Sequence, residues 1–257
     1  MKIIGIIPAR LASSRLPNKP MADILGMPMI GHVYYRSKLS AVLDEVYVAT
    51  CDNEILEYIN SIGGKAIMTS LKHERASDRT AEALLIIEKE TGVKVDIVVM
   101  IQGDEPMITP EMIDAAIQPI LIDNSINITN LMESISTIEE HEDPAEVKVV
   151  VDSKNNALYF SREPIPSRKK GASSIPMLKQ VCIIPFRRDF LIEYNQMEPT
   201  PLEIIESIDM NRLLENGLKI RMVLRDEQTY SVDTHLDLEN VNKRMIHDHL
   251  ILKYNKL

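Results

Sequence analysis

The chain has 257 residues, of which 45% are hydrophobic and 26% are charged, and its formal net charge is −9. Such a chain is long enough to bury a full core, and its acidity argues against a nucleic-acid-binding protein, which needs a basic face. Two cysteines are too few for a disulfide framework, and the first apolar run is too short for a signal peptide or a membrane span. We therefore expect a cytoplasmic globular protein that binds no nucleic acid and no membrane.

Predicted strands and helices alternate through the first half of the chain. The apolar runs at 2–9, 45–52, 65–70 and 96–104 are typical of buried strands. Helical patterns follow them, and the predicted helices cover 28–39, 53–62 and 78–91, with another that begins at Pro110. Asp52 is expected to cap the second of these helices. The alternation predicts an α/β fold with a mainly parallel sheet flanked by helices.

The pattern changes after about residue 125. Two segments, 147–152 and 157–162, flank the turn-forming tetrapeptide Ser-Lys-Asn-Asn and predict a β-hairpin. After it we expect a strand at 180–186, a helix at 201–217, strands at 219–224 and 229–233, and a helix from 236. The chain is then one domain, 1–257, in which a smaller lobe at about 126–215 is inserted between a main portion, about 1–125, and its return at 216–257.

Polar side chains follow three of the predicted strands, where ligands bind in open α/β sheets. Arg10, Arg15 and Lys19 lie after the first strand, in a loop without glycine. Asp104 follows the most apolar strand, and Asp233 follows the last one. Three cations could clamp a polyphosphate, and two carboxylates could hold Mg²⁺. Together they favour nucleoside-triphosphate chemistry, although each cluster alone is also compatible with a solvated loop or a turn.

Several long motifs resemble those of one enzyme family. They are IIPARxxSxRLPxKP, GGKAIMTSxxH, QGDEPMI, VKVVVDxxxxALYFSRxPIP and VDT, in this order between residues 3 and about 240. They are similar to the motifs of 3-deoxy-manno-octulosonate (Kdo) cytidylyltransferases, which make CMP-Kdo for lipopolysaccharide or capsule. The resemblance implies a GT-A-like nucleotidyltransferase, usually a homodimer, that uses CTP, Mg²⁺ and a small anionic acceptor.

The resemblance also implies roles for individual residues. An acceptor hydroxyl would attack the α-phosphorus of CTP, and pyrophosphate would leave. The matching catalytic positions are Arg10, Arg15, Lys19 and Asp104, and the matching metal ligands are Asp104 and Asp233. The other positions that match nucleotide contacts are Ala9, His73, Ser77, Arg79 and Gln102. The expected acceptor contacts are Gln102, Arg162, Gln180, Phe186 and Asp209, in the inserted lobe apart from Gln102.

The sequence departs from the family pattern mainly among the expected acceptor contacts. Gln180 stands where a histidine is usual, and Ile184 and Phe186 stand where two tyrosines are usual. A site that hydrogen-bonds a sugar depends on such groups. The acceptor is therefore Kdo or a related 2-keto sugar acid, or else a phosphonate or other non-sugar anion. A catalytically silent nucleotide-binding protein is a third possibility, which the retained cations and aspartates oppose.

Overall fold

The computed structural model describes residues 1–13, 15–169 and 174–254. The chain forms two compact units: unit 1 is Met1–Asp114 with Thr229–Leu257, and unit 2 is Ala115–Gln228. These boundaries differ from the predicted ones at about 125 and 215. The hydroxyl of Thr129 donates to the Ala116 carbonyl, which ties the second half of helix α4 (Pro110–Ile122) to unit 2. Strand β12 (Arg221–Arg225) also belongs to unit 2, because it pairs with β7 (Thr129–Ser134).

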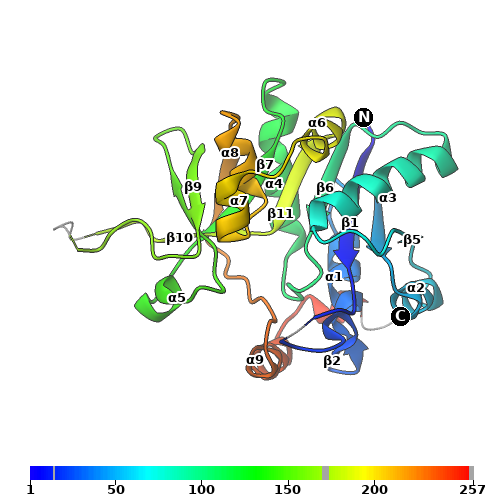
Figure 1. Cartoon of the computed structure of the whole chain (residues 1–257). Helices are drawn as coiled ribbons and strands as arrows, with labels where there is room; N and C mark the ends of the chain where they lie inside the picture. Colours follow the sequence, from blue (N-terminus) through cyan, green and yellow to red (C-terminus); the bar gives the residue numbers. More distant parts are fainter. Residues whose placement is uncertain (14, 170–173, 255–257) are drawn as a thin grey trace. The chain divides into compact units, whose positions relative to one another are not determined.

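The predicted parallel sheet forms the centre of unit 1. In this unit the strand order is β6-β1-β4-β5, and every neighbouring pair is parallel. The strands are β1 (Ile3–Ala9), β4 (Glu45–Thr50), β5 (Ala66–Met68) and β6 (Ile97–Ile101). Helix α3 (Ala76–Thr91) runs across β1 and β6 (Figure 1). The connecting helices are α1 (Met29–Lys38) and α2 (Asn53–Ser61). These elements confirm the predicted α/β class.

The carboxyl ends of β1 and β6 approach each other closely. Gly103, just after β6, would place a Cβ atom 3.3 Å from the Pro8 carbonyl oxygen and 3.2 Å from Cδ1 of Ile30. A larger residue would therefore push the two strand ends apart. The close approach brings the segments after β1 and β6 to the same edge of the sheet.

The C-terminal segment completes unit 1. The predicted strand at 229–233 does not form, and Val232 instead donates its N–H to the Asp104 carbonyl over 2.9 Å. Helix α9 (His235–Met245) follows and lies beside the small ribbon of β2 (Asp23–Ile24) and β3 (Met27–Pro28) (Figure 1). The side chain of Asn242 accepts a hydrogen bond from the Leu25 N–H, which joins α9 to this ribbon. A short helix, α10 (Ile251–Tyr254), ends the described chain.

Unit 2 contains a second sheet with the strand order β12-β7-β10-β8-β9. Strands β8 (Lys148–Val151) and β9 (Ala157–Ser161) form the predicted hairpin, and only β12 runs parallel to its neighbour. The predicted strand at 180–186 is in fact two strands, β10 (Leu178–Val181) and β11 (Ile183–Arg187). Unit 2 also contains the helices α5 (Ile138–Glu142) and α6 (Arg188–Asn195).

The predicted helix at 201–217 is also two elements. They are α7 (Pro201–Glu206) and α8 (Met210–Glu215). Ser207 separates them with a φ of 54°, a left-handed conformation that ends an α-helix. None of the helices in the described parts of the chain has the length and apolar character that crossing a membrane requires.

Candidate active site

The cationic loop after β1 is held by its backbone. The Leu11 N–H donates to Oδ2 of Asp52 over 2.8 Å, and the side chain of Leu16 is only 2% exposed. Asp52 does occupy the N-cap position of α2, but its side chain makes no capping hydrogen bond there. The prediction of a capping side chain is therefore wrong. The carboxylate instead anchors the loop through the Leu11 N–H.

Four charged side chains meet at this edge of unit 1. The ammonium of Lys19 lies 2.7 Å from Oδ2 of Asp104 and 2.9 Å from Oδ1 of Asp233. The guanidinium of Arg15 lies 3.0 Å from Oδ2 of Asp233. Three segments that are far apart in the sequence thus contribute to one cluster. We expected this convergence from positions after three strands, although the last of these strands does not form and Asp233 precedes α9 instead.

The two carboxylates are positioned by main-chain hydrogen bonds. The Asp104 carbonyl accepts the N–H of Val232, so the chains on either side of the two aspartates are joined. The N–H groups of Asp233 and Thr234 donate to Oδ2 of Asp237 over 3.1 and 2.8 Å. Thr234 and Asp237 form a capping box that begins α9. The side chain of Asp233 therefore projects from a well-defined helix start.

The cluster is electrically balanced, with two cations and two carboxylates. Burial lowers the pKa of Lys19, but the neighbouring charges of Asp104 and Asp233 outweigh burial and raise it above its usual value. Lys19 is therefore charged throughout the physiological range. Arg10 is exposed at the end of β1 and makes no hydrogen bond or ion pair with the residues that the structure describes. Its guanidinium can therefore bind an anionic ligand without losing another partner.

The predicted metal ligands form a pair rather than a larger cluster. In the described ranges, no three His, Cys, Asp or Glu side chains are grouped in a way that could hold a metal ion. Two carboxylates that already converge on one cationic group suit Mg²⁺, which keeps several waters and shares phosphate oxygens with its ligands. They do not suit a structural zinc ion, which takes four protein ligands.

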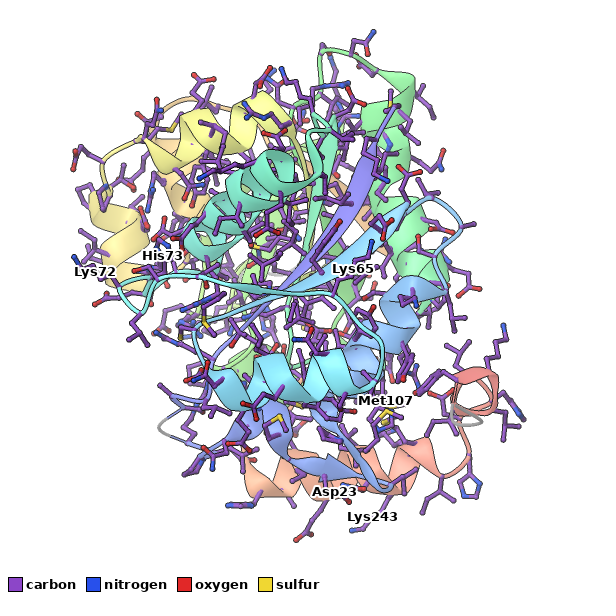
Figure 2. The ribbon with its side chains drawn as sticks, turned by 90° about the vertical axis from the view of Figure 1, so that its right-hand side faces the viewer. Asp23, Lys65, Lys72, His73, Met107 and Lys243 are labelled. Carbon is purple, nitrogen blue, oxygen red and sulfur yellow. The ribbon has the colours of Figure 1, made fainter. Side chains whose placement is uncertain are left out.

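The segment expected to contact the base leads from β5 into α3. Figure 2 shows His73 on this loop, and its Nε2 lies 2.6 Å from Oε2 of Glu82. Ser77 is fully buried, and Arg79 is only 3% exposed. Arg79 donates to the Thr69 hydroxyl over 2.5 Å. Arg79 therefore supports the loop, and His73 is the most accessible side chain of the three, while contacts of Ser77 and Arg79 with the nucleotide stay a prediction.

Ala9 and Gln102 end the two central strands. Ala9 is 7% exposed and pairs with Thr50 of β4, so it offers a ligand little beyond its backbone. Gln102 is partly exposed, directly after β6. Both positions lie at the same edge of the sheet as the charged cluster.

Four of the expected acceptor contacts belong to unit 2. Arg162 donates from Nε to the Glu206 carbonyl and from Nη1 to the Pro144 carbonyl, over 2.9 and 2.8 Å. Gln180 donates from Nε2 to Oδ1 of Asn130 over 2.5 Å. Backbone carbonyls thus hold the Arg162 side chain in a defined orientation, and the Asn130 side chain does the same for Gln180. Asp209 is partly exposed, and its carbonyl accepts a hydrogen bond from the Tyr194 hydroxyl.

Phe186 is not an accessible acceptor contact. Its side chain is 0% exposed, and its ring is stacked on Tyr194 with 6.1 Å between the ring centroids. Ile184 is also buried, at 2% exposure. Both residues are part of the hydrophobic core of unit 2. The two positions at which the family usually has tyrosines therefore lie in the core of this protein.

Four supporting residues were not foreseen from the sequence. Asp52 was taken for a helix cap, and Asp237 could have been recognised from the Thr-x-x-Asp spacing at 234–237. Asn130 and Glu206 have no such signal, because each acts through contacts distant in the sequence. Glu206 accepts hydrogen bonds from the Tyr159 hydroxyl, the Ser161 hydroxyl and the Arg162 N–H.

Comparisons with known proteins identify the family of the chain. The family model described as "Cytidylyltransferase" matches residues 4–220. A 3-deoxy-manno-octulosonate cytidylyltransferase of Geobacter metallireducens is 41% identical over 255 residues, which cover 95% of this chain and 98% of the relative. The corresponding enzyme of Geotalea uraniireducens is 42% identical, with 95% and 99% covered.

Solved structures give the same result. A CMP:2-keto-3-deoxy-manno-octonic acid synthetase in complex with CTP aligns with a TM-score of 0.87 and 40% identity, over 96% of this chain and 99% of that one. A putative glucose-1-phosphate thymidylyltransferase from Bacillus anthracis shares the fold alone, with a TM-score of 0.64 and 18% identity. The chain belongs to the 3-deoxy-manno-octulosonate cytidylyltransferase family.

Proposed function

We propose that this protein transfers CMP from CTP to Kdo and releases pyrophosphate. The observation that carries the proposal is the cluster in which Lys19 lies 2.7 and 2.9 Å from two carboxylates, with Arg15 beside it. Cations and carboxylates at one strand edge suit a metal-bound triphosphate. The relatives and the solved neighbour, whose names specify Kdo and CTP, support this substrate pair.

The reaction needs positioning and charge neutralisation more than covalent help from the protein. A hydroxyl oxygen of the acceptor forms a bond to the α-phosphorus of CTP, and the bond from that phosphorus to the bridging oxygen breaks. Negative charge then builds up on the leaving pyrophosphate. Arg10, Arg15 and Lys19 stabilise this charge, because all three follow β1 and reach the same edge of the sheet. The anchored loop keeps them in place before the reaction starts.

Asp104 and Asp233 would hold the proposed Mg²⁺. When bound, the ion offsets phosphate charge and acidifies a coordinated hydroxyl group. The two aspartates fit it by their chemistry, and the position of the Lys19 ammonium between them supports a cation site there. Val232 and Asp237 keep the carboxylates at the site through the backbone bonds described above.

We favour Kdo as the acceptor over a phosphonate or another non-sugar anion. The altered residues Ile184 and Phe186 are buried in the core, so they no longer argue for a different acceptor. Arg162 can pair with the acceptor carboxylate through its remaining N–H groups, and Gln180 can hydrogen-bond a hydroxyl. Relatives about 40% identical over almost the whole chain bear names that specify Kdo.

We also propose that the protein acts as a homodimer in the cytoplasm. Unit 2 exposes large apolar side chains on β9 and α7: Leu158 is 61%, Ile204 62% and Ile205 75% exposed. Both elements pack on α8, so they belong to one part of this unit. Exposed apolar groups of this kind are typical of subunit contacts. Light scattering after gel filtration would measure the dimer mass, and a monomeric mass would exclude it.

A pyrophosphate-release assay tests the function. The protein is incubated with Mg²⁺, one of the four nucleoside triphosphates and one acceptor: Kdo, another 2-keto sugar acid or a small phosphonate. We expect release with CTP and Kdo only. Release only with CTP and a phosphonate would support CMP transfer from CTP but refute Kdo as the acceptor. CTP binding without release for any acceptor would favour a catalytically silent nucleotide-binding protein.

A further inference from the structure

The ammonium of Lys19 occupies the space between the two carboxylates that would bind the metal. It is within 3 Å of both Asp104 and Asp233, at 2.7 and 2.9 Å. Its side chain is 15% exposed, and those of the two aspartates are 19% and 21% exposed. Most of this ion pair is therefore shielded from solvent. Shielded charge pairs attract each other more strongly than pairs on a surface. A divalent ion and Lys19 cannot both take this position.

The charges of the cluster determine whether a metal ion and a triphosphate bind there separately or together. Lys19 and Arg15 together balance Asp104 and Asp233. A metal ion alone would add two positive charges beside two existing cations, which repel it. A triphosphate alone would bring its negative oxygens beside two carboxylates. After a ligand enters, every charge has a partner only if both have bound: phosphate oxygens pair with the cations, and the metal pairs with the aspartates.

We propose that Lys19 is an internal cation that competes with the divalent metal for Asp104 and Asp233, and that a bound nucleoside triphosphate relieves the competition by taking the Lys19 ammonium. Metal and nucleotide then bind as a coupled pair, and each strengthens the binding of the other by the same factor. This inference rests on the proposed function, because it assumes that a triphosphate is the ligand.

The local structure allows the ammonium to move while the backbone stays in place. The Lys19 N–H donates to the Leu16 carbonyl over 3.2 Å, and the Ala22 N–H donates to the Lys19 carbonyl over 3.1 Å. Pro20, the next residue in the 3₁₀ helix η1 (Lys19–Met21), is buried. The lysine stem has four rotatable bonds and carries its charge as a single point. The ammonium can therefore turn from the carboxylates to phosphate oxygens by side-chain rotation.

The direct test measures Mn²⁺ binding to the protein without nucleotide, from the electron paramagnetic resonance signal of free Mn²⁺. We expect Lys19→Met to bind Mn²⁺ about tenfold or more tightly than the wild type. A second change, Asp104→Asn, should remove this gain. The matched control is Lys65→Met, because Lys65 also pairs with a carboxylate, Glu45 at 2.6 Å, but on the surface. It should bind Mn²⁺ as the wild type does.

Two further variants guard against effects on folding. Lys19→Gln should show the same gain as Lys19→Met, whereas Lys19→Arg keeps a cation and should show none. Equal Mn²⁺ affinity in Lys19→Gln, Lys19→Met and the wild type would overturn the inference, and so would the same gain in Lys65→Met. Pyrophosphate release by the wild type is measured separately. Turnover of CTP and Kdo without a gain in the variants refutes only the competition, and a gain without any turnover refutes only the proposed function.

Discussion

The Asp52 carboxylate accepts a 2.8 Å hydrogen bond from the Leu11 N–H, which joins two segments 41 residues apart in the sequence. This bond lies directly after Arg10 and before Arg15, so it determines where the loop cations point. It also connects the loop to the end of β4, beside the central strand of unit 1. A single carboxylate outside the charged cluster thus helps to organise that cluster.

We predict that Asp52→Ala lowers kcat/KM for CTP by about tenfold, because the loop N–H loses its partner and the cations lose their fixed position. The cost in unfolding free energy should be about 1–3 kcal/mol. Asp44→Ala is the control, since Asp44 accepts a 2.7 Å bond from the Ile3 N–H at the opposite end of β1. Steady-state kinetics and urea unfolding of both variants decide the matter. An equal loss of kcat/KM in the two variants would show that Asp52 acts only through stability.

Much of unit 1 could be predicted because its signals are local. Continuous isoleucine- and valine-rich runs such as those at β1 and β6 suit strands buried on both faces, and alternation with helices then requires parallel pairing. The carboxyl ends of parallel strands share one edge, so Lys19 and Asp104 could be expected near each other. Asp233 reaches the same place without the predicted strand, because the Val232 N–H donates to the Asp104 carbonyl. The loop anchor could not be expected, because Asp52 also satisfies the local pattern of a helix cap.

The errors arise where tertiary contacts override local patterns. The segment 201–217 has a helix-like pattern of apolar residues, yet Ser207 adopts a left-handed conformation and Glu206 holds β9 and Arg162 instead of continuing a helix. Phe186 was expected at the acceptor because of its position in a motif. Its burial against Tyr194 is visible only when the chain is folded. The sequence alone therefore predicted the charged cluster of unit 1 better than the contacts that support the site.

Removal of one metal-binding carboxylate should nearly abolish turnover. We expect Asp104→Asn to lower kcat by at least about a hundredfold, because charge stabilisation at the phosphates is lost. The fold should remain, since the Asp104 backbone bond to Val232 does not involve the side chain. Circular dichroism and the pyrophosphate assay measure the two effects. Residual activity above a tenth of the wild type would contradict the metal role of this residue.

Gln180 should affect the acceptor and not the nucleotide. The amide nitrogen of Asn130 donates to the Leu131 and Val181 carbonyls, so its Oδ1 must face Gln180, and Gln180 donates to it. The side-chain oxygen Oε1 of Gln180 is then directed away from Asn130. In that orientation it can accept a hydrogen bond from a sugar hydroxyl. We predict that Gln180→Leu raises KM for Kdo about tenfold and leaves KM for CTP unchanged.

The control for this prediction is Gln228→Leu, because Gln228 donates to the Ser136 hydroxyl at an exposed position in the same unit. Gln180→His should retain activity with Kdo, since an imidazole can also hydrogen-bond a hydroxyl. A KM for Kdo that is the same in Gln180→Leu, Gln228→Leu and the wild type would place the acceptor contact elsewhere.

His32 should make stability depend on pH. Burial lowers its pKa, and the nearby positive charge of Arg36 lowers it further. The Ile24 carbonyl, 2.8 Å away, can only accept, so Nε2 carries the proton and Nδ1 accepts from the Tyr254 hydroxyl over 2.9 Å. A second proton would turn Nδ1 into a donor, so the Tyr254 hydroxyl, which already accepts from Nε of Arg36, could no longer donate to it. The folded state therefore binds this proton less readily than the unfolded state does.

The stabilisation by neutral His32 is thus complete above the unfolded pKa of about 6.5 and is lost as the pH falls from there through the lower folded pKa. We expect the unfolding free energy of the wild type to decrease over this interval. His32→Asn should be less stable at pH 8 and should show a flatter dependence, whereas His247→Asn, at an exposed position, should follow the wild type. Urea unfolding between pH 5 and 8 measures this. The same slope in His32→Asn and the wild type would refute the assignment.

The most direct measurement of the central claim is product analysis by mass spectrometry after incubation of the protein with CTP, Mg²⁺ and Kdo, combined with quantification of pyrophosphate. If Lys19, Arg10 and Arg15 stabilise a leaving pyrophosphate while the acceptor hydroxyl attacks the α-phosphorus, a CMP–Kdo conjugate and pyrophosphate must form in equal amounts. Consumption of CTP to free CMP without a conjugate, or no consumption of CTP in the presence of Kdo, would contradict the claim.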